Sequence, residues 1–412
     1  MLKMPCLKLI KILVIICLTL YLNSCEQKAN LTNQPTETKG NLLIWHSFTN
    51  NDAQVFKSIL NEYSSIHTNL KLVSEYVSEK KMTNQFIEQS QSGFGPDLAI
   101  IWYSHLYELS QKTIIIELNS KNIDLSKYLP VTLNHIKLNN KIYALPFSMN
   151  VQVLCYHKNK IKIPAKTWSE LVQQTKRGIK VGITSDFIST FWGVGSMGGK
   201  FLDQQGNIAF PKVAWSQWLQ MLQKANIEPN TILSEQKQLL REAFIKGELD
   251  YYTCESIEIS EIKNKLPKNN LGVSLLPGEN NQTAKPFIDT EVIVLNQSSS
   301  PKQQQLALQL ANFLTNLEQQ EKFAVQAESQ IPVTIESQVD YRLSPIQAIL
   351  LKQAQDGISI PLDLISKTKG RIGKRGNQLY YQVLAGEITA DEAANEMNKF
   401  VILINQENRS TQ

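Results

Sequence analysis

Short apolar runs alternate with helically spaced apolar positions over the first third of the chain. Continuous apolar stretches bounded by polar or turn residues are typical of buried strands, whereas apolar positions three and four apart indicate a helix with one buried face. The sequence therefore predicts strands at residues 41–45, 70–77 and 98–102, and a helix at 52–66. Strands that alternate with helices favour a parallel sheet with helices on its faces.

The same criteria predict further strands in the middle of the chain and helices in its second half. The remaining predicted strands are at 141–146, 151–156 and 250–253, and the predicted helices are at 168–175, 214–225, 236–246 and 303–325, with two more within 379–399. We find no internal repeat. The length is enough for two domains.

The amino-terminal pattern is different. Three lysines precede residues 12–22, which are uncharged and mostly apolar. Eleven residues are too few for a span of roughly 30 Å, so the pattern is typical of an export signal that is removed. The sequence Leu22-Asn-Ser-Cys25 resembles the bacterial lipobox, which implies cleavage before Cys25 and acylation of its thiol, although asparagine is unusual at its position. We expect a signal peptide at 1–24 and a polar tether at 25–40; a plain secreted protein is the alternative.

Charge and cysteine content narrow the class of protein. The net charge is +5, and removal of the three signal lysines would leave the chain near +2, which is too weakly basic to indicate a nucleic-acid partner. Cys155 and Cys254 could pair in an oxidising compartment, but one pair is no disulfide framework, so their pairing stays open. No later segment has eighteen consecutive apolar residues, so membrane contact would depend on the lipid alone.

Eight short segments follow one another in a definite order. They are IWHSF (44–48), GFGPDLAIIW (93–102), KIYALPFSMNVQVLCYHK (141–158), PAKTWSEL (164–171), AFIKGELDYYTCES (243–256), NLGVSLLPG (270–278), ANFLTNLEQQEKFAVQAESQIPV (311–333) and YYQVLAGEITADEAANEM (380–397). Each segment alone is weak evidence of a family. Taken in this order and spacing, the eight segments resemble the family of extracellular solute-binding proteins of ABC importers that includes the maltose-binding proteins. The resemblance covers nearly the whole mature chain.

This resemblance implies an α/β fold, a two-lobed clamshell of the type II periplasmic-binding-protein class. Each lobe would be a mainly parallel sheet flanked by helices, and three crossings near 148–155, 286–291 and 332–345 would form the hinge. The expected division is lobe 1 at 41–149 with 290–332, lobe 2 at 150–289 with 333–405, and a tail at 406–412.

The resemblance also implies a function. The protein would capture a small solute, a carbohydrate, in the cleft between the lobes and deliver it to an ABC permease. Only a ligand that contacts both lobes would favour the closed form, through a hinge-type motion. The implied protein is a monomer without catalysis, cofactor or metal. It would be exported and lipid-anchored on the outer face of the cytoplasmic membrane, in the periplasm if an outer membrane is present.

Candidate ligand contacts are carried over position by position from the resemblance. They are His46, Ser47, Trp102, Tyr103, Ser104, Asn150, Asp186, Phe191, Trp192, Glu255, Ser256 and Arg371. Carboxylates and amides can bind adjacent hydroxyls, and an aromatic face can pack on the apolar face of a sugar ring, so these residue types suit a carbohydrate.

Several of these positions have competing interpretations. Trp102 ends an apolar strand and could face the core, and His46 could be an exposed loop residue. Asp289 is a further candidate on a crossing strand. Arg371 lies where sugar-binding relatives often have an aromatic residue or arginine; it could bind a hydroxyl pair or an anion, or belong to a flexible basic loop. Without that aromatic, a small or anionic sugar fits better than a long glucan.

The sequence gives less support to other classes of protein. Residues 193–198 fit a dinucleotide fingerprint but do not open a helix after a strand, and the five histidines lack metal-ligand spacing. The open alternatives are a binding protein for iron, a polyamine or a phosphorylated polyol, and a lipid-anchored carbohydrate hydrolase. Tyr251 and Tyr252 are adjacent in a strand and would face opposite ways, which weakens the iron alternative. No spacing identifies the carboxylate pair of a hydrolase.

Overall fold

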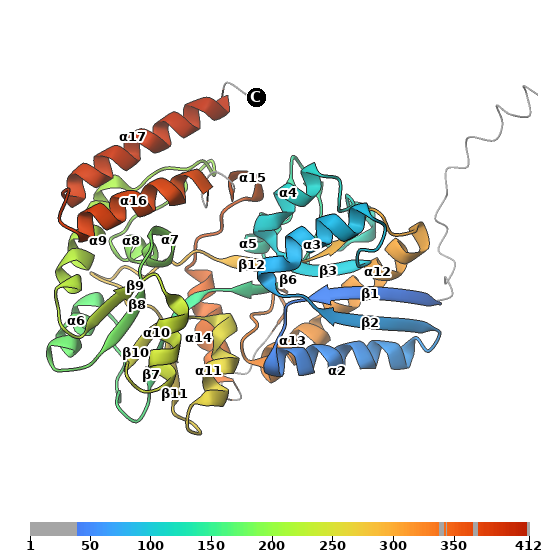
Figure 1. Cartoon of the computed structure of the whole chain (residues 1–412), viewed down its shortest axis with the longest axis horizontal. Helices are drawn as coiled ribbons and strands as arrows, with labels where there is room; N and C mark the ends of the chain where they lie inside the picture. The colour runs from blue at the N-terminus through green and yellow to red at the C-terminus, as the bar shows by residue number, and fades with distance from the viewer. Residues whose placement is uncertain (1–38, 338–341, 343, 366–369, 410–412) are drawn as a thin grey trace, which may run out of the picture. The chain divides into compact units, whose positions relative to one another are not determined.

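The computed structural model describes residues 39–337, 342, 344–365 and 370–409. The expected signal peptide, Cys25, almost all of the tether and the end of the tail lie outside the described residues. From residue 39 onward the chain forms two five-stranded sheets, each with helices packed on it (Figure 1). None of the described helices is both long and apolar enough to cross a membrane.

The first sheet combines parallel and antiparallel strands. Its order is β2 (Leu70–Tyr76), β1 (Gly40–His46), β3 (Leu98–Trp102), β12 (Asp289–Leu295) and β6 (Leu145–Asn150). Strand β1 is parallel to β2 and β3, while β12 is antiparallel to β3 and β6. Strand β3 is buried along almost its whole length, as its continuous apolar run predicts, and β12 is buried to the same extent although it begins with three polar residues.

The second sheet has the same mixture. Its order is β11 (Leu271–Ser274), β7 (Gln152–His157), β10 (Tyr251–Glu255), β8 (Val181–Thr184) and β9 (Thr231–Ser234). Strand β8 is parallel to β9 and β10, and β7 is antiparallel to β10 and β11. In each sheet four of the five strands run in the same direction, which confirms the expectation of mainly parallel sheets; the reversed strand is β12 in the first sheet and β7 in the second. Strands β7 and β12 enter their sheets directly from the other lobe, and this reverses their direction.

Amphipathic helices cover both sheets. On the first sheet they are α2 (Asn50–Ile66), α3 (Glu79–Gln91), α4 (Leu106–Gln111), α12 (Pro301–Leu314) and α13 (Leu317–Ala327). Around the second sheet they are α6 (Trp168–Lys176), α7 (Phe187–Thr190), α8 (Trp192–Ser196), α9 (Lys212–Asn226), α10 (Lys237–Ile245), α11 (Ile259–Lys265), α14 (Pro345–Gln355), α16 (Gly373–Leu384) and α17 (Ala390–Arg409). Helix α2 shows the principle, because it buries Val55, Phe56 and Ile59 on one face.

The chain passes between the two sheets at several points. Val151 alone separates β6 from β7, and Met149 pairs with Ile331 on another crossing segment. A third crossing precedes β12, where Phe287 pairs with Ile358. The short helix α15 (Leu362–Ile365) packs on α4 and on strand β4 (Lys137–Leu138) of the first lobe, although we expected residues 333–405 in the second.

A disulfide joins Cys155 on β7 to Cys254 on β10. Both residues are fully buried in the second sheet. The sequence left this pairing open, because the two cysteines lie 99 residues apart and nothing local brings them together. The antiparallel pairing of β7 with β10 brings the two cysteines close together.

Candidate functional site

Polar side chains gather where the two sheets meet. In the first sheet Asp289 pairs with Asn150, so the start of β12 and the end of β6 lie at one edge. In the second sheet Gln152 pairs with Glu255, so the start of β7 and the end of β10 also share an edge. Because only Val151 separates Asn150 from Gln152, these two edges adjoin at a crossing of the chain. Open α/β sheets bind ligands at such carboxyl edges.

The Asn150 side chain is held by the second sheet. Its Nδ2 donates to Glu255 Oε2 over 2.9 Å, and its Oδ1 accepts from the Ser256 hydroxyl over 2.8 Å. The Ser256 hydroxyl in turn accepts from the Val151 backbone N–H over 3.3 Å. These bonds fix the orientation of the amide at the crossing point.

Two hollows lie along these edges. The larger has a volume of about 170 Å³ and is lined by Asn150, Gln152, Ile188, Ser189, Glu255, Pro286, Phe287, Ile288 and Asp289. The smaller, of about 10 Å³, is lined by Ser47, Glu79, Met82, Ile100, Ile101, Trp102, His105 and Glu291. The first draws residues from both lobes, and the second belongs to the first lobe.

Carboxylates from both lobes influence one another across this region. Glu79, the first residue of α3, is exposed to solvent, but partial burial of its carboxyl group raises its pKa. Glu255 and Asp289 raise the pKa of Glu79 further, against the smaller opposing effects of Lys237 and of a hydrogen bond from the Trp102 side chain. That bond also holds the half-exposed Trp102 ring at the end of β3.

Glu291 forms the buried floor of the smaller hollow. It pairs with Trp102 in the sheet, and its Oε2 accepts from the Ser148 hydroxyl over 2.7 Å. Burial raises the pKa of Glu291 from 4.5 to about 8, helped by Asp52, Glu79 and Asp289 and opposed by the Ser148 bond. The carboxyl group is therefore protonated at neutral pH.

The charged group behind Glu255 is Lys237. Its Nζ lies 2.5 Å from Glu255 Oε1 and 3.9 Å from Glu258 Oε1. Burial works against the lysine charge, but Glu255 and Glu258 outweigh it and raise the pKa of Lys237. Arg241 adds contacts of 3.5 Å to Glu258 and 3.1 Å to Glu261. The second-lobe edge is therefore an ion-pair network, whose geometry fixes Glu255.

The structure brings four of the sequence-based candidates to the hollows, namely Ser47, Trp102, Asn150 and Glu255. Ser256 lies beside them but is fully buried, where it orients Asn150. Ser104, next to Trp102, is half-buried and lines neither hollow.

Other candidates lie in the core. His46 packs on Phe48 with ring centroids 5.4 Å apart, its Nδ1 accepts from the Phe48 N–H, and burial lowers its pKa to about 4. Tyr103 is fully buried, and its ring stacks on His135 with ring centroids 3.8 Å apart.

Phe191 and Trp192 are each 1% exposed. The ring of Phe191 stacks on Phe287, with centroids 5.1 Å apart, and so supports a residue that lines the larger hollow. Trp192 packs on Trp168 and Trp218. The turn of α7 thus presents Ile188 and Ser189 to the hollow and directs the two aromatic rings inward.

The last two candidates have structural partners. Asp186 caps α7, since its Oδ1 accepts from the Ser189 N–H over 2.8 Å. Arg371 is exposed and lies 2.5 Å from Glu407 Oε2, an ion pair that raises the arginine pKa. Its guanidinium also lies over the Phe400 ring at 5.8 Å. These contacts hold Arg371 against α17.

Sequence reasoning missed Glu79, His105, Gln152, Ser189, Phe287 and Glu291 among the lining residues. A signal existed for Glu79, because it follows the second predicted strand much as Ser47 follows the first. None existed for Glu291, which is the last of three polar residues at the start of β12 and acquires its place only through pairing with β3.

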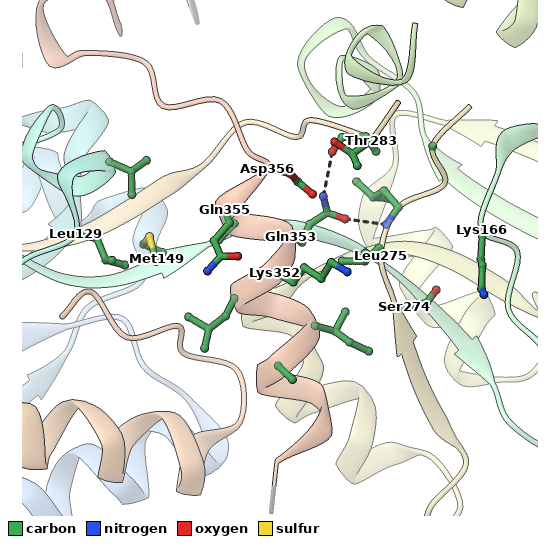
Figure 2. A pocket seen from close by; sticks show the side chains of 18 of the residues that line it. Leu129, Met149, Lys166, Ser274, Leu275, Thr283, Lys352, Gln353, Gln355 and Asp356 are labelled. Carbon is green, nitrogen blue, oxygen red and sulfur yellow. Dashed lines mark hydrogen bonds between the residues drawn. The ribbon is translucent and has the colours of Figure 1, made fainter. Parts of the chain in front are cut away.

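A larger cavity, of about 940 Å³, lies on the other side of β6 (Figure 2). Met149 lines it, whereas Asn150 lines the hollow described above; successive strand residues point to opposite faces. At this cavity Gln353 of α14 accepts a hydrogen bond from the Leu276 N–H at 2.8 Å and donates one to the Ala284 carbonyl at 3.1 Å. The cavity wall is mainly apolar, so the convergent polar groups favour the edge hollows as the ligand site.

Metal binding has no support in the part of the chain that the structure describes, where no group of three or more histidine, cysteine, aspartate or glutamate residues could hold an ion. Tyr251 and Tyr252 are both fully buried, so they do not form the exposed pair that an iron site would use.

Two mixed sheets joined by adjacent crossings, with polar edges facing a common cleft, define a two-lobed binding protein of type II. Residues 59–342 match the family model described as bacterial extracellular solute-binding protein. The chain belongs to this family of bacterial extracellular solute-binding proteins, whose extracellular place implies export.

Curated relatives match part of the chain. It is 27% identical over 177 residues to the maltotriose-binding protein of Pyrococcus abyssi, covering 40% of this chain and 38% of that protein. It is 25% identical over 201 residues to an uncharacterized ABC transporter extracellular-binding protein of Pyrococcus horikoshii, covering 44% and 47%. The chain thus matches less than half of the length of either relative.

The fold is also that of a solved sugar-binding protein. The structure of the maltose-maltodextrin binding protein of Alicyclobacillus acidocaldarius superposes with a TM-score of 0.71 and 18% identity, over 88% of this chain and 100% of that one. At this identity the likeness establishes the fold alone.

Proposed function

We propose that this protein is the solute receptor of an ABC importer and that its solute is a carbohydrate. The observation that carries the proposal is the bond from Asn150 to Glu255, which joins the carboxyl edges of two lobes at a crossing. A solute in the adjoining hollow would contact both lobes and so favour their closure. The maltotriose-binding relative supports a sugar as the solute.

The chemistry of the hollows suits hydroxyl groups. Asn150, Gln152 and Ser189 offer amides and a hydroxyl, and Glu255 offers a carboxylate acceptor. Phe287 and Trp102 provide aromatic surface for the apolar face of a sugar ring. The proposed site uses these residues and keeps Ser47 as a first-lobe contact.

The proposed receptor performs no catalysis. It binds and releases its solute unchanged, and it acts as a monomer that presents its closed form to the membrane subunits of the importer. Acylation of Cys25 would anchor it to the outer face of the cytoplasmic membrane, since more than one acyl chain gives firm binding. A carbohydrate hydrolase is the competing function, and it differs by forming product.

A thermal-shift screen of the mature protein against mono- and oligosaccharides tests the proposal, because a ligand that binds only the folded form raises the melting temperature. We expect at least one sugar to stabilise the protein and to be recovered chemically intact. Stabilisation by ferric ion alone, or cleavage of the sugar, would contradict the proposal.

The anchor has a separate test in whole cells. Cys25→Ser should release the protein from the membrane fraction and leave sugar binding unchanged. If the variant stays with the membrane pellet, the lipid anchor at Cys25 is refuted.

A further inference from the structure

The walls of the two hollows are acidic. The described residues that line them include the carboxyl groups of Glu79, Glu255 and Asp289, together with the protonated Glu291, and neither a lysine nor an arginine. Glu79 reaches the region from α3 of the first lobe, and Glu255 ends β10 of the second. Negative groups therefore approach the same space from both sides of the cleft.

The nearest cations are already paired with carboxylates of the second lobe, Glu255 of the lining among them. Lys237 lies against Glu255, and Arg241 lies against Glu258 and Glu261. Lys265 also pairs with Glu261, at 2.6 Å, so three positive groups face three negative ones in this network. Glu79 of the first lobe is a further negative group beside this balanced network, and it supplies the surplus of negative charge. Burial is the main cause of the raised pKa of Glu79, and Glu255 and Asp289 raise that pKa further.

This charge distribution discriminates among sugars. An anionic sugar would be repelled, and a neutral sugar would leave the negative surplus as it is. A protonated amine would offset that surplus and donate three hydrogen bonds to carboxylate oxygens. The larger hollow, at about 170 Å³, is below the roughly 300–1,000 Å³ typical of pockets for larger ligands, so it suits one ring rather than a long chain.

Aromatic surface adds to the same preference. The Trp102 ring is fixed through its bond to Glu79, so a ring face and a carboxylate are offered side by side. An aromatic face attracts cations and also packs on the apolar face of a sugar. The combination fits a ring that carries hydroxyls and one ammonium group.

We infer that the solute is an amino sugar, bound with its protonated amine between Glu79 of the first lobe and Glu255 of the second. This inference rests on the proposed function and names its substrate class. Glu79 then acts as a specificity-determining residue, because it contributes its charge only when the lobes lie close together.

Matched sugar pairs test the inference by calorimetry on the mature protein at about pH 6.5, where an amine of this type is protonated. The pairs are glucosamine with glucose, and the β-1,4-linked glucosamine dimer with its N-acetylated form. We expect the amine-bearing member to bind about tenfold tighter or more. This advantage should shrink at about 1 M salt, where charge interactions are screened within about 3 Å.

Two variants locate the effect. Glu79→Gln keeps the size of the side chain and removes its charge, so the amine advantage should fall severalfold while binding of the neutral partner changes little. Glu108→Gln is the matched control, because Glu108 is an exposed residue of α4 paired with Lys112. It should leave the ratio unchanged. Melting temperatures of both variants show that they are folded.

Neutral sugars that bind as tightly as their amine partners would overturn the inference and leave the proposed sugar receptor standing. An unchanged ratio in Glu79→Gln would overturn the role of Glu79. Binding of spermidine with no binding of any sugar would overturn both the inference and the proposed carbohydrate function.

Discussion

Asn150 is the last residue of β6 in the first sheet, directly before the chain crosses to the second sheet. Its side-chain Nδ2 nevertheless donates a hydrogen bond of 2.9 Å to Glu255 Oε2 at the edge of the second sheet. The same residue, Asn150, therefore stands at a crossing between the lobes and is a candidate ligand contact. Any rotation of one lobe relative to the other would therefore act on the orientation of this amide through the same short segment.

Asn150→Ala should weaken solute binding by about ten- to a hundredfold, because a hydrogen bond to a charged group contributes roughly 1.5–3 kcal/mol. Binding is measured by calorimetry with the sugar found in the screen. Asn119→Ala is the control, since Asn119 caps an exposed turn through the Lys121 N–H at 3.0 Å. Equal affinities of wild type and Asn150→Ala would contradict the placement of the site.

Loss of the Cys155–Cys254 bridge should lower the free energy of unfolding by about 2–4 kcal/mol, because the bridge restricts the unfolded chain between residues 99 positions apart. Denaturant titration of Cys155→Ala, Cys254→Ala and the double variant measures this. Either single variant should lose most of what the double variant loses, since each removes the same bond. Alkylation of two thiols in the unreduced, denatured wild type would show that the bridge is absent.

Stability should depend on pH through Glu291. The folded state keeps the Glu291 proton up to a pKa of about 8, whereas the unfolded state releases it near 4.5, so rising pH favours unfolding across this window. His46, with a pKa lowered to about 4, acts in the opposite direction but only below 6.5. Between 6.5 and 8 the free energy of unfolding should therefore fall by up to about 1.4 kcal/mol per pH unit from Glu291.

Glu291→Gln isolates this group, since the amide oxygen can still accept from Ser148. The variant should gain stability over wild type as pH rises from about 6.5 to 8. Parallel pH profiles for the two proteins, followed by denaturant titration, would show that Glu291 does not titrate in this window.

Gly193→Ala should destabilise the second lobe by about 1–3 kcal/mol, the usual result of overpacking. A Cβ at Gly193 would lie 2.1 Å from Cε2 of the buried Trp218 ring. Gly370→Ala is the control, because a Cβ there meets no atom within 4 Å. Thermal unfolding of both variants checks the difference; equal melting temperatures would mean that Trp218 moves freely. The glycine of the apparent dinucleotide fingerprint thus serves side-chain packing.

The sequence predicted the elements well where the apolar pattern is continuous, as in β1 and β3, and it located the crossing at Asn150 through the resemblance. It predicted mainly parallel sheets but not which strand of each sheet is reversed, because that depends on the lobe from which the strand enters. It also left the bond between Cys155 and Cys254 open, since only the pairing of β7 with β10 brings them together.

The site was harder to predict than the fold. Around α7 the sequence favoured Phe191 and Trp192, but one helical turn directs those rings into the core and presents Ser189 instead. Large aromatic residues near a predicted site are more often packed than exposed, and the sequence cannot assign their face. Glu291 lay beyond sequence reasoning, because its importance arises from neighbours on β3 and β6.

The bridge within the second sheet also bears on where this protein matures. Thiols stay reduced in the cytoplasm and oxidise after export. A precursor awaiting translocation would therefore carry Cys155 and Cys254 as free thiols, with a second lobe that opens more easily than in the finished protein. The chain would be easier to thread through the membrane before export and harder to unfold once it has arrived.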